Sequence, residues 1–131
     1  MNRTILIEFG NELVTAELLE HDAPNLCRSI LDALPVETWA HHSRVSTHEI
    51  IIPFPKIIES ENLTKEYGVG ALAWVAARND IDVFYDNIRP LGPLGLFGRI
   101  VHNLEGLKRE AIKTWIKAGT KVRISKKQEN D

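Results

Sequence analysis

The stretch Leu96–Leu107, LFGRIVHNLEGL, decides the fold because it changes from a strand pattern to a helix pattern. Residues 96–101 read as a strand, Asn103 is a good helix N-cap, and apolar residues then recur at helical spacing. A phosphate-binding loop would need its glycines between strand and helix, where backbone amides can face an anion. Gly98 instead lies inside the strand, a position typical of close backbone approach or of a bend in a barrel. The stretch therefore predicts a scaffold and not a nucleotide site.

The flanking sequence predicts many short strands and only two helices. Strands are expected at residues 3–10, 13–19, 36–45, 49–55, 71–77, 81–86, 96–101 and 121–125. Helices are expected at 24–34, with Asp22 as N-cap, and at 103–119, with Gly119 as terminator. Since antiparallel hairpins dominate, we expect a mainly β fold, a closed eight-stranded antiparallel barrel with two capping α-helices.

Length and composition limit the classes of protein. The 131 residues fit a single barrel domain over 1–125, followed by a solvated tail over 126–131. A net charge of −2 gives no basic field for nucleic acid, and no apolar run is long enough to cross a membrane. The N-terminus lacks a signal-peptide pattern, so a cytoplasmic location is expected. Cys27 is the only cysteine, which excludes an internal disulfide and favours a buried apolar role.

Two segments resemble cyclophilins. Residues 13–31, LVTAELLEHDAPNLCRSIL, resemble the strand and the alanine-proline junction that lead into the first helix of that family. Residues 96–112, LFGRIVHNLEGLKREAI, resemble its late strand and second helix, and VRI at 122–124 fits its closing strand. The resemblance implies the same eight-stranded barrel with two helices.

The middle of the chain departs from the prolyl isomerases of that family. AHHSRV at 40–45 is the nearest match to their phenylalanine-histidine-arginine motif, with Arg44 displaced. The glutamine-glycine-glycine run has no counterpart, and DIDVFYD at 80–86 keeps Phe84 but lacks the glutamine of serine-glutamine-phenylalanine-phenylalanine. The chain thus looks more like the small prokaryotic cyclophilin-like proteins of unknown function than like a prolyl isomerase.

Residues 38–49, TWAHHSRVSTHE, form the densest polar group on an expected strand pair. We predict a ligand groove there, formed by His42, Arg44, Trp74, Phe84 and Tyr85, and Arg89 either joins it or anchors its own loop. The predicted ligand is a small molecule or a short peptide. No paired-carboxylate motif is apparent, and Asp82 and Asp86 are read as a solvated strand face.

Two other functions stay open. A prolyl isomerase with degenerate motifs would use Arg44 as its catalytic residue, because a guanidinium can stabilise the twisting amide. An interaction or assembly module would use segment 56–70 or a strand edge, and a homodimer is compatible with the sequence. Adjacent His41 and His42 point to opposite faces of a strand, so we expect no metal site, and we expect no cofactor.

Overall fold

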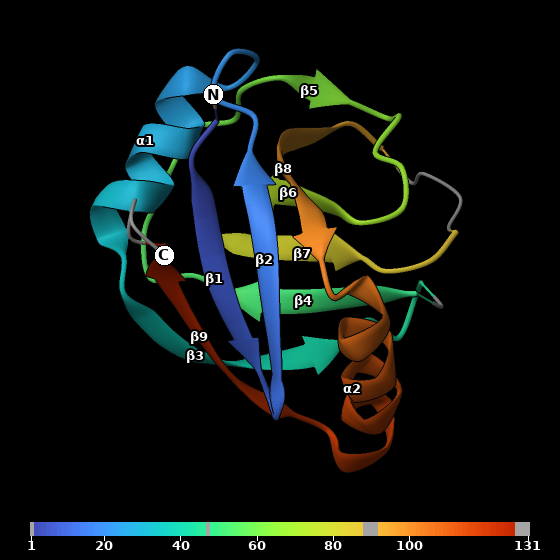
Figure 1. Ribbon diagram of the computed structural model, residues 1–131. Helices are drawn as coiled ribbons and strands as arrows, with labels where there is room; N and C mark the ends of the chain where they lie inside the picture. Colours follow the sequence, from blue (N-terminus) through green and yellow to red (C-terminus); the bar gives the residue numbers. More distant parts are fainter. Residues whose placement is uncertain (1, 47, 88–91, 128–131) are drawn as a thin grey trace.

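The computed structural model describes residues 2–46, 48–87 and 92–127 (Figure 1). Its strands pair with one another in a closed circle. The strands are β1 (Thr4–Phe9), β2 (Glu12–Leu18), β3 (Val36–His42), β4 (Glu49–Pro53), β5 (Leu63–Thr64), β6 (Ala71–Val75), β7 (Asp80–Phe84), β8 (Leu94–His102) and β9 (Thr120–Lys126). The helices are α1 (Pro24–Ala33) and α2 (Leu104–Lys117).

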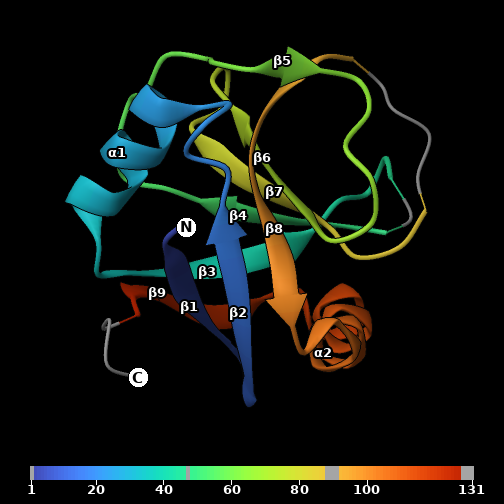
Figure 2. The same ribbon diagram turned by 45° about the horizontal axis from the view of Figure 1, so that its top comes forward.

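The circle contains eight antiparallel strands in the order β2-β1-β9-β3-β4-β7-β6-β8, and β8 pairs again with β2 to close it. The predicted closed eight-stranded barrel with two helices is therefore confirmed. The short ninth strand, β5, pairs only with the start of β8. It was not predicted, because two residues within the charged segment 56–70 carry no strand period. The helices lie on opposite sides of the barrel (Figures 1 and 2).

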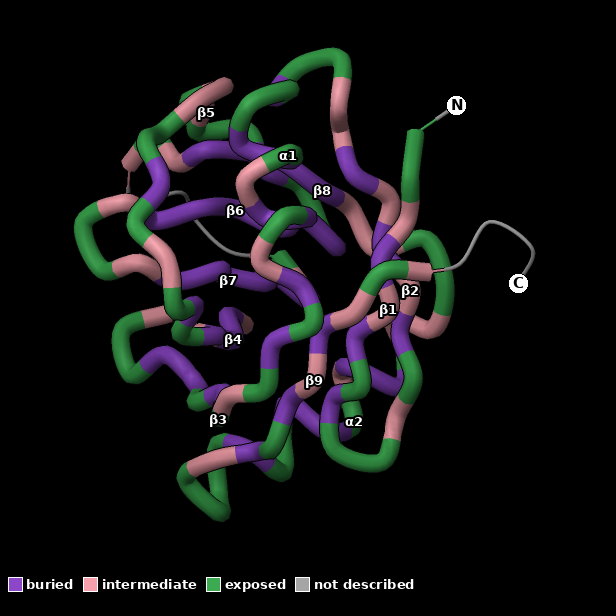
Figure 3. Tube along the Cα trace, turned by 90° about the vertical axis from the view of Figure 1, so that its left-hand side faces the viewer, coloured by how far each residue is buried: buried purple, intermediate pink, exposed green. Residues whose placement is uncertain are grey.

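The barrel interior is apolar, as strand alternation requires. Inward-facing residues such as Ile5, Ile7, Ile50 and Phe97 are almost completely buried. β6 and β7 differ from this pattern because every one of their residues is buried, which Figure 3 shows as unbroken purple segments. A strand buried on both faces must be covered on its outer face as well. This cover positions the site described below.

β8 contains the stretch from which the fold was predicted. Gly98 lies between β2 and β6, and a Cβ there would meet the Glu17 carbonyl oxygen at 3.2 Å and Leu72 Cβ at 3.4 Å. Close backbone approach therefore explains this glycine, as predicted. Arg99 points the other way and donates to the backbone oxygens of Tyr67, at 2.9 Å, and Val69, at 3.3 Å. Arg99 thus fastens the segment before β6 to the outside of the barrel.

The start of α1 differs from the prediction. Asp22 is not the N-cap, a position that Ala23 takes without a side-chain hydrogen bond. A glutamate from the distant segment 56–70 replaces it. Glu61 Oε1 accepts from the backbone amides of Asn25 and Leu26, both at 2.9 Å, and its other oxygen accepts from Asn25 Nδ2 at 3.0 Å. A carboxylate here satisfies orphan donors and complements the helix dipole.

α2 begins as predicted, and Gly119 directly follows its C-cap residue, Ala118, where the terminator was predicted. The Asn103 side chain accepts from the backbone amide of Gly106 at 3.1 Å, which confirms it as N-cap. Ala118, and not Gly119, takes the left-handed conformation at the C-terminus. The helix packs on β2, β3 and β9.

β9 runs through Lys126, which pairs with Ile5. The remaining predicted tail, 128–131, lies outside the described residues. Within the described part of the chain, no helix is long and apolar enough to cross a membrane.

Candidate functional site

The outer face of β4, β7 and β6 carries an unusual set of side chains. The register places Ile51 of β4 and Ala73 of β6 beside Asp82, and Glu49 beside Phe84. Paired residues of neighbouring strands share a face. Ala73 is small and leaves the Asp82 carboxyl uncrowded on one side. The residues before and after Asp82 in β7, Ile81 and Val83, point into the barrel.

The segment that precedes β6 covers this outer face. The Tyr67 ring stacks on Phe84 at a centroid distance of 4.7 Å and an interplanar angle of 7°. The Tyr67 hydroxyl donates to the Gly92 carbonyl oxygen. Together with the Arg99 contacts to Tyr67 and Val69, this arrangement makes a second, smaller core outside the barrel. Its buried members are Tyr67, Ala71, Ala73, Phe84 and Leu96.

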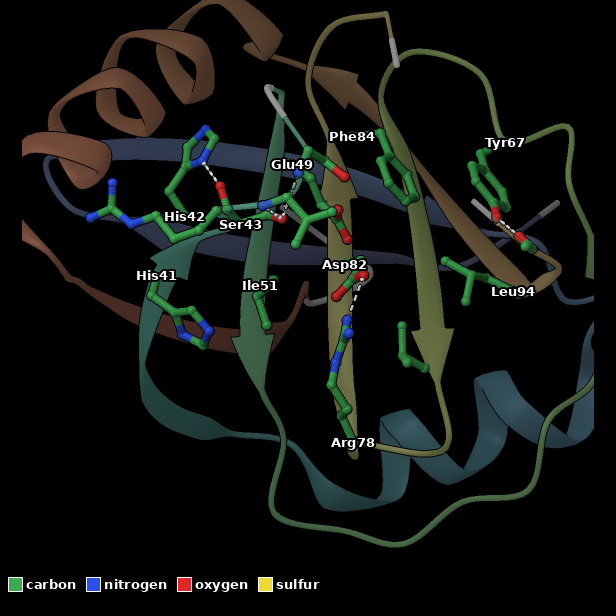
Figure 4. Close-up of a pocket in the computed structure, with 15 residues that line it drawn as sticks. His41, His42, Ser43, Glu49, Ile51, Tyr67, Arg78, Asp82, Phe84 and Leu94 are labelled. Carbon is green, nitrogen blue, oxygen red and sulfur yellow. Dashed lines mark hydrogen bonds and ion pairs between the residues drawn. The ribbon is translucent and has the colours of Figure 1, made fainter. Parts of the chain in front are cut away.

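Beside this second core lies a cavity of about 490 Å³. Its lining consists of residues 41–46, Glu49, Ile51, Tyr67, Val75, Arg78, Asp82, Phe84, Gly92 and Leu94 (Figure 4). The volume lies within the range of small-molecule sites, roughly 300–1,000 Å³. Most walls are apolar, and the acidic residues of the lining, Glu49 and Asp82, lie together at one place.

That place is a carboxyl cluster formed by Glu49, Asp80 and Asp82, which are 6%, 4% and 1% exposed. Arg78 is the cation that contacts it: Nε donates to Asp80 Oδ2 at 2.9 Å, and Nη2 donates to Asp82 Oδ2 at 3.2 Å. In Figure 4 Asp82 lies between Glu49 and Arg78. No donor among the described residues reaches Oδ1 of Asp80 or of Asp82. Such buried acceptors are rare in folded proteins and call for an explanation.

Burial and the neighbouring acids control the charge of the cluster. Desolvation is the main reason why the pKa of Asp82 rises to about 11, and hydrogen bonding to Glu49 and Asp80 adds to it. A protonated Asp82 can donate to another carboxyl, which two ionised carboxylates cannot do for each other. Asp82 is therefore a neutral carboxylic acid near pH 7.

This cluster corrects two predictions. Asp82 is not on a solvated face, because segment 56–70 covers the outer side of β7. Asp86 lies beyond the end of β7 and does not share the burial of Asp82. The sequence also gave no sign of paired carboxyls, since Glu49 and Asp82 are distant in the chain. β4–β7 pairing is the signal that would have brought them together.

His42 and Tyr85, two predicted site residues, are hydrogen-bonded to each other. His42 Nε2 lies 2.7 Å from the Tyr85 hydroxyl, and Nδ1 lies 2.8 Å from the Ser43 carbonyl oxygen. Because a carbonyl oxygen only accepts, Nδ1 carries a proton. Burial, reinforced by the charge of Asp86, raises the pKa of Tyr85, so its hydroxyl stays protonated. In Figure 4 the His42 ring turns toward α2 and away from Asp82.

Arg44 lies at the junction between the cavity and α2. Its guanidinium carbon lies 4.0 Å from the centroid of a Trp115 ring, and Nη2 donates to the Trp115 carbonyl oxygen at 3.3 Å. His42 contacts the same indole edge-on at 4.9 Å. A second hollow, of about 430 Å³, lies beside His42 and Trp115. Its lining is His42, His48, Tyr85, Asp86, Lys108, Ile112, Trp115 and Ile116.

The remaining predicted residues divide between the two faces of the sheet. Phe84 lines the outer cavity. Trp74 lies inside the barrel, completely buried, where it packs edge-on against Phe54 and its Nε1 donates to the Ile58 carbonyl oxygen at 2.8 Å. It therefore has no surface in common with the other four. Arg89 lies outside the described residues.

Metal and thiol chemistry find little support in the described part of the chain. Within residues 2–46, 48–87 and 92–127, no group of three or more histidine, cysteine, aspartate or glutamate side chains could hold a metal ion. Cys27 is buried, as predicted, and burial raises the pKa of its thiol to about 12. A thiol that stays protonated is a poor nucleophile.

Comparison with solved structures identifies related folds. The structure of McbB in complex with tryptophan matches with a TM-score of 0.84 at 19% identity, over 95% of this chain and 45% of McbB. The solution structure of the hypothetical protein AF2241 from Archaeoglobus fulgidus matches with a TM-score of 0.75 at 26% identity, over 96% of this chain and 95% of AF2241. This chain thus spans less than half of McbB, and that likeness concerns the fold alone.

Sequence comparison identifies the family. No curated protein matches the chain. The family model described as "Protein of unknown function (DUF3830)" matches residues 5–126. The chain belongs to this family.

Proposed function

We propose that this member of the DUF3830 family binds a small organic molecule in the cavity on the outer face of β4, β7 and β6. One observation carries the proposal: Asp82 is 1% exposed and lines the cavity, yet no donor from the described residues reaches its Oδ1. A buried acceptor without a donor costs about 1–3 kcal/mol, and a structure retains it where function requires it. A ligand that donates to this atom would remove that cost.

The walls of the cavity support a ligand with an apolar body. Phe84, Ile51 and Leu94 supply apolar surface, and the acidic groups of the lining belong to the carboxyl cluster. Sites for small molecules commonly combine apolar walls with a few placed polar groups. The cavity therefore suits a molecule with one polar end and one flat or aliphatic end.

The residues predicted from the sequence divide into those that we retain and those that we do not. Phe84 forms a wall in the proposal, and His42 and Arg44 stand at the edge nearest α2. Tyr85 acts through its hydrogen bond to His42 and faces the second hollow. Trp74 supports the wall from inside the barrel without contact with the ligand.

No observation favours the alternative of a prolyl isomerase. Arg44 would have to donate to a peptide amide, whereas its guanidinium stacks on Trp115 and donates to that residue's carbonyl oxygen. A cyclophilin-like ancestry and a cytoplasmic location in a prokaryote remain part of the proposal, on the sequence resemblance alone. A short peptide would enter the same cavity through one side chain.

The test is a fragment screen by protein NMR, with chemical-shift changes mapped on the intact chain. We expect ligands to shift the signals of Ile51, Phe84 and Asp82, and to lose affinity when Ile51→Trp fills the cavity. Val101→Trp is the matched control, because Val101 is 54% exposed on β8 and does not line the cavity. Saturable binding that Ile51→Trp leaves unchanged would refute the proposal, and so would the absence of any fragment bound to the cavity.

A further inference from the structure

We infer that the ligand carries a protonated amine, held by Glu49 next to Asp82, with its apolar body against Phe84. The inference rests on the proposed function, and it narrows the chemistry of the same cavity to organic ammonium compounds. It follows from the balance of charges, from the donors already used and from the shape of the cavity.

The charges of the cluster do not balance. Three carboxyl groups, those of Glu49, Asp80 and Asp82, face the single bonded guanidinium of Arg78. Among the described residues, the carboxyl groups of the cluster therefore outnumber the cations bonded to them. No described cation forms an ion pair with Glu49, although its side chain is nearly buried. Buried charges in proteins are normally paired, and a ligand cation would complete this pair.

The cations near the cavity are already engaged. Arg78 is bound to both aspartates, and Arg44 lies over the Trp115 ring with a hydrogen bond to the Trp115 carbonyl oxygen. An anionic ligand would therefore meet a net negative wall with no uncommitted guanidinium. An uncharged ligand would leave the charge of Glu49 unpaired. These two comparisons favour an ammonium ion over a carboxylate or an alcohol.

The hydrogen-bonding atoms of the cavity also favour an organic ammonium compound. The cavity presents acceptor oxygens, namely the Glu49 carboxyl, which forms no ion pair with a described cation, and Asp82 Oδ1, which no described protein donor reaches. An ammonium group has three donors and no acceptor, so it can serve both oxygens at once. Phe84 and Ile51 lie next to these acceptors on the same sheet face. A primary amine with a short apolar or aromatic body matches this arrangement.

The experiment compares three probes of similar shape and different charge on the intact chain: benzylamine, benzyl alcohol and benzoate. Isothermal titration calorimetry at pH 7 measures each affinity. We expect benzylamine to bind about ten-fold tighter than benzyl alcohol, because its hydrogen bonds are charge-assisted, and benzoate to bind weakest of the three. Ile51→Trp should abolish the benzylamine signal.

Glu49→Gln tests the residue itself. We expect this variant to lose about ten-fold in benzylamine affinity and to leave benzyl alcohol unchanged, since it removes charge and keeps size. Glu59→Gln is the control, because Glu59 is exposed and does not line the cavity. Circular dichroism and thermal unfolding confirm that each variant is folded before it is titrated.

The outcomes separate the two proposals. Equal affinities for benzylamine and benzyl alcohol, both abolished by Ile51→Trp, would refute the ammonium inference and leave the cavity as a ligand site. Preferred binding of benzoate would also refute the inference. Benzylamine binding that Glu49→Gln does not weaken would refute the role of Glu49. A failure of every fragment to reach the cavity would refute the proposed function itself.

Discussion

The two faces of β7 are equally buried and chemically different. Ile81 and Val83 point into the barrel and belong to its hydrophobic core. Asp80 and Asp82 point outward and are buried as deeply, yet each keeps one oxygen that no described donor reaches. The inner face thus stabilises the barrel. The outer face keeps an unfavourable group that a ligand could satisfy.

A third carboxyl makes the contrast sharper. Glu61 accepts three hydrogen bonds at the N-terminus of α1, all from donors within its own fold. It therefore has a structural role although it lies in the charged segment to which the sequence assigned functional potential. Three hydrogen-bond donors fix Glu61, whereas Asp82 has one bonded oxygen and Glu49 has none bonded to a described cation. Hydrogen bonding thus distinguishes the carboxyl group that stabilises the fold, Glu61, from those that lack a full set of donors.

The largest effect is expected on the inner face of β7. Ile81→Ala removes a completely buried side chain and leaves a cavity, which should lower the free energy of unfolding by about 2–5 kcal/mol. Urea denaturation followed by tryptophan fluorescence measures the loss. A change below about 0.5 kcal/mol, the usual size for a surface substitution, would mean that the barrel interior is not packed as described.

Removal of the carboxylate that caps α1 should have an intermediate effect. Glu61→Ala leaves the amides of Asn25 and Leu26 without their acceptor, and should lower the free energy of unfolding by about 1 kcal/mol. Glu59→Ala, an exposed neighbour in the same segment, is the matched control and should change it little. Equal stabilities of the two variants would contradict the structural role of Glu61.

At pH 5 the smallest effect is expected at Asp82. The native protein holds a proton on Asp82 that the unfolded chain releases above its ordinary pKa of about 3.9. The contribution of Asp82 to stability is therefore greatest at low pH and declines as pH rises through that value and beyond. Asp82→Asn cannot ionise, keeps an oxygen for Arg78, and should be as stable as the parent at pH 5; above that, its advantage over the parent should grow by about 1.4 kcal/mol per pH unit up to pH 8.

Denaturation curves at several pH values measure this difference, and carbon-13 NMR of the Asp82 carboxyl reports its proton directly. An Asp82 signal that titrates near pH 4 would contradict the description of the cluster. A stability difference between Asp82→Asn and the parent that is the same at pH 5 and pH 8 would also contradict it.

The sequence predicted the barrel because its signals are local. Asn103 caps α2 next to a strand, Pro24 opens α1, and Gly98 marks close approach, all readable from neighbouring residues. The departures have non-local causes. Glu61, far along the chain, replaced Asp22 as the cap of α1, and β5 is too short to show a period.

The site was less predictable for the same reason. Alternation correctly put Asp82 on the outer face of β7, but only the packing of Tyr67 on Phe84 reveals that this face is covered. The sequence predicted His42 and Arg44 as site residues because they are polar residues on a strand, and both line the cavity. It also predicted the aromatic residue Trp74, which lies inside the barrel. Strand register, which no single segment encodes, brought Glu49 to Asp82.

The most direct test of the account is a crystal structure of the intact chain with benzylamine. The account predicts that the amine nitrogen lies within hydrogen-bonding distance, about 2.7–3.2 Å, of Glu49 and of Asp82 Oδ1, with the ring against Phe84. Benzylamine bound only outside the cavity, with no contact to the carboxyl cluster, would contradict it.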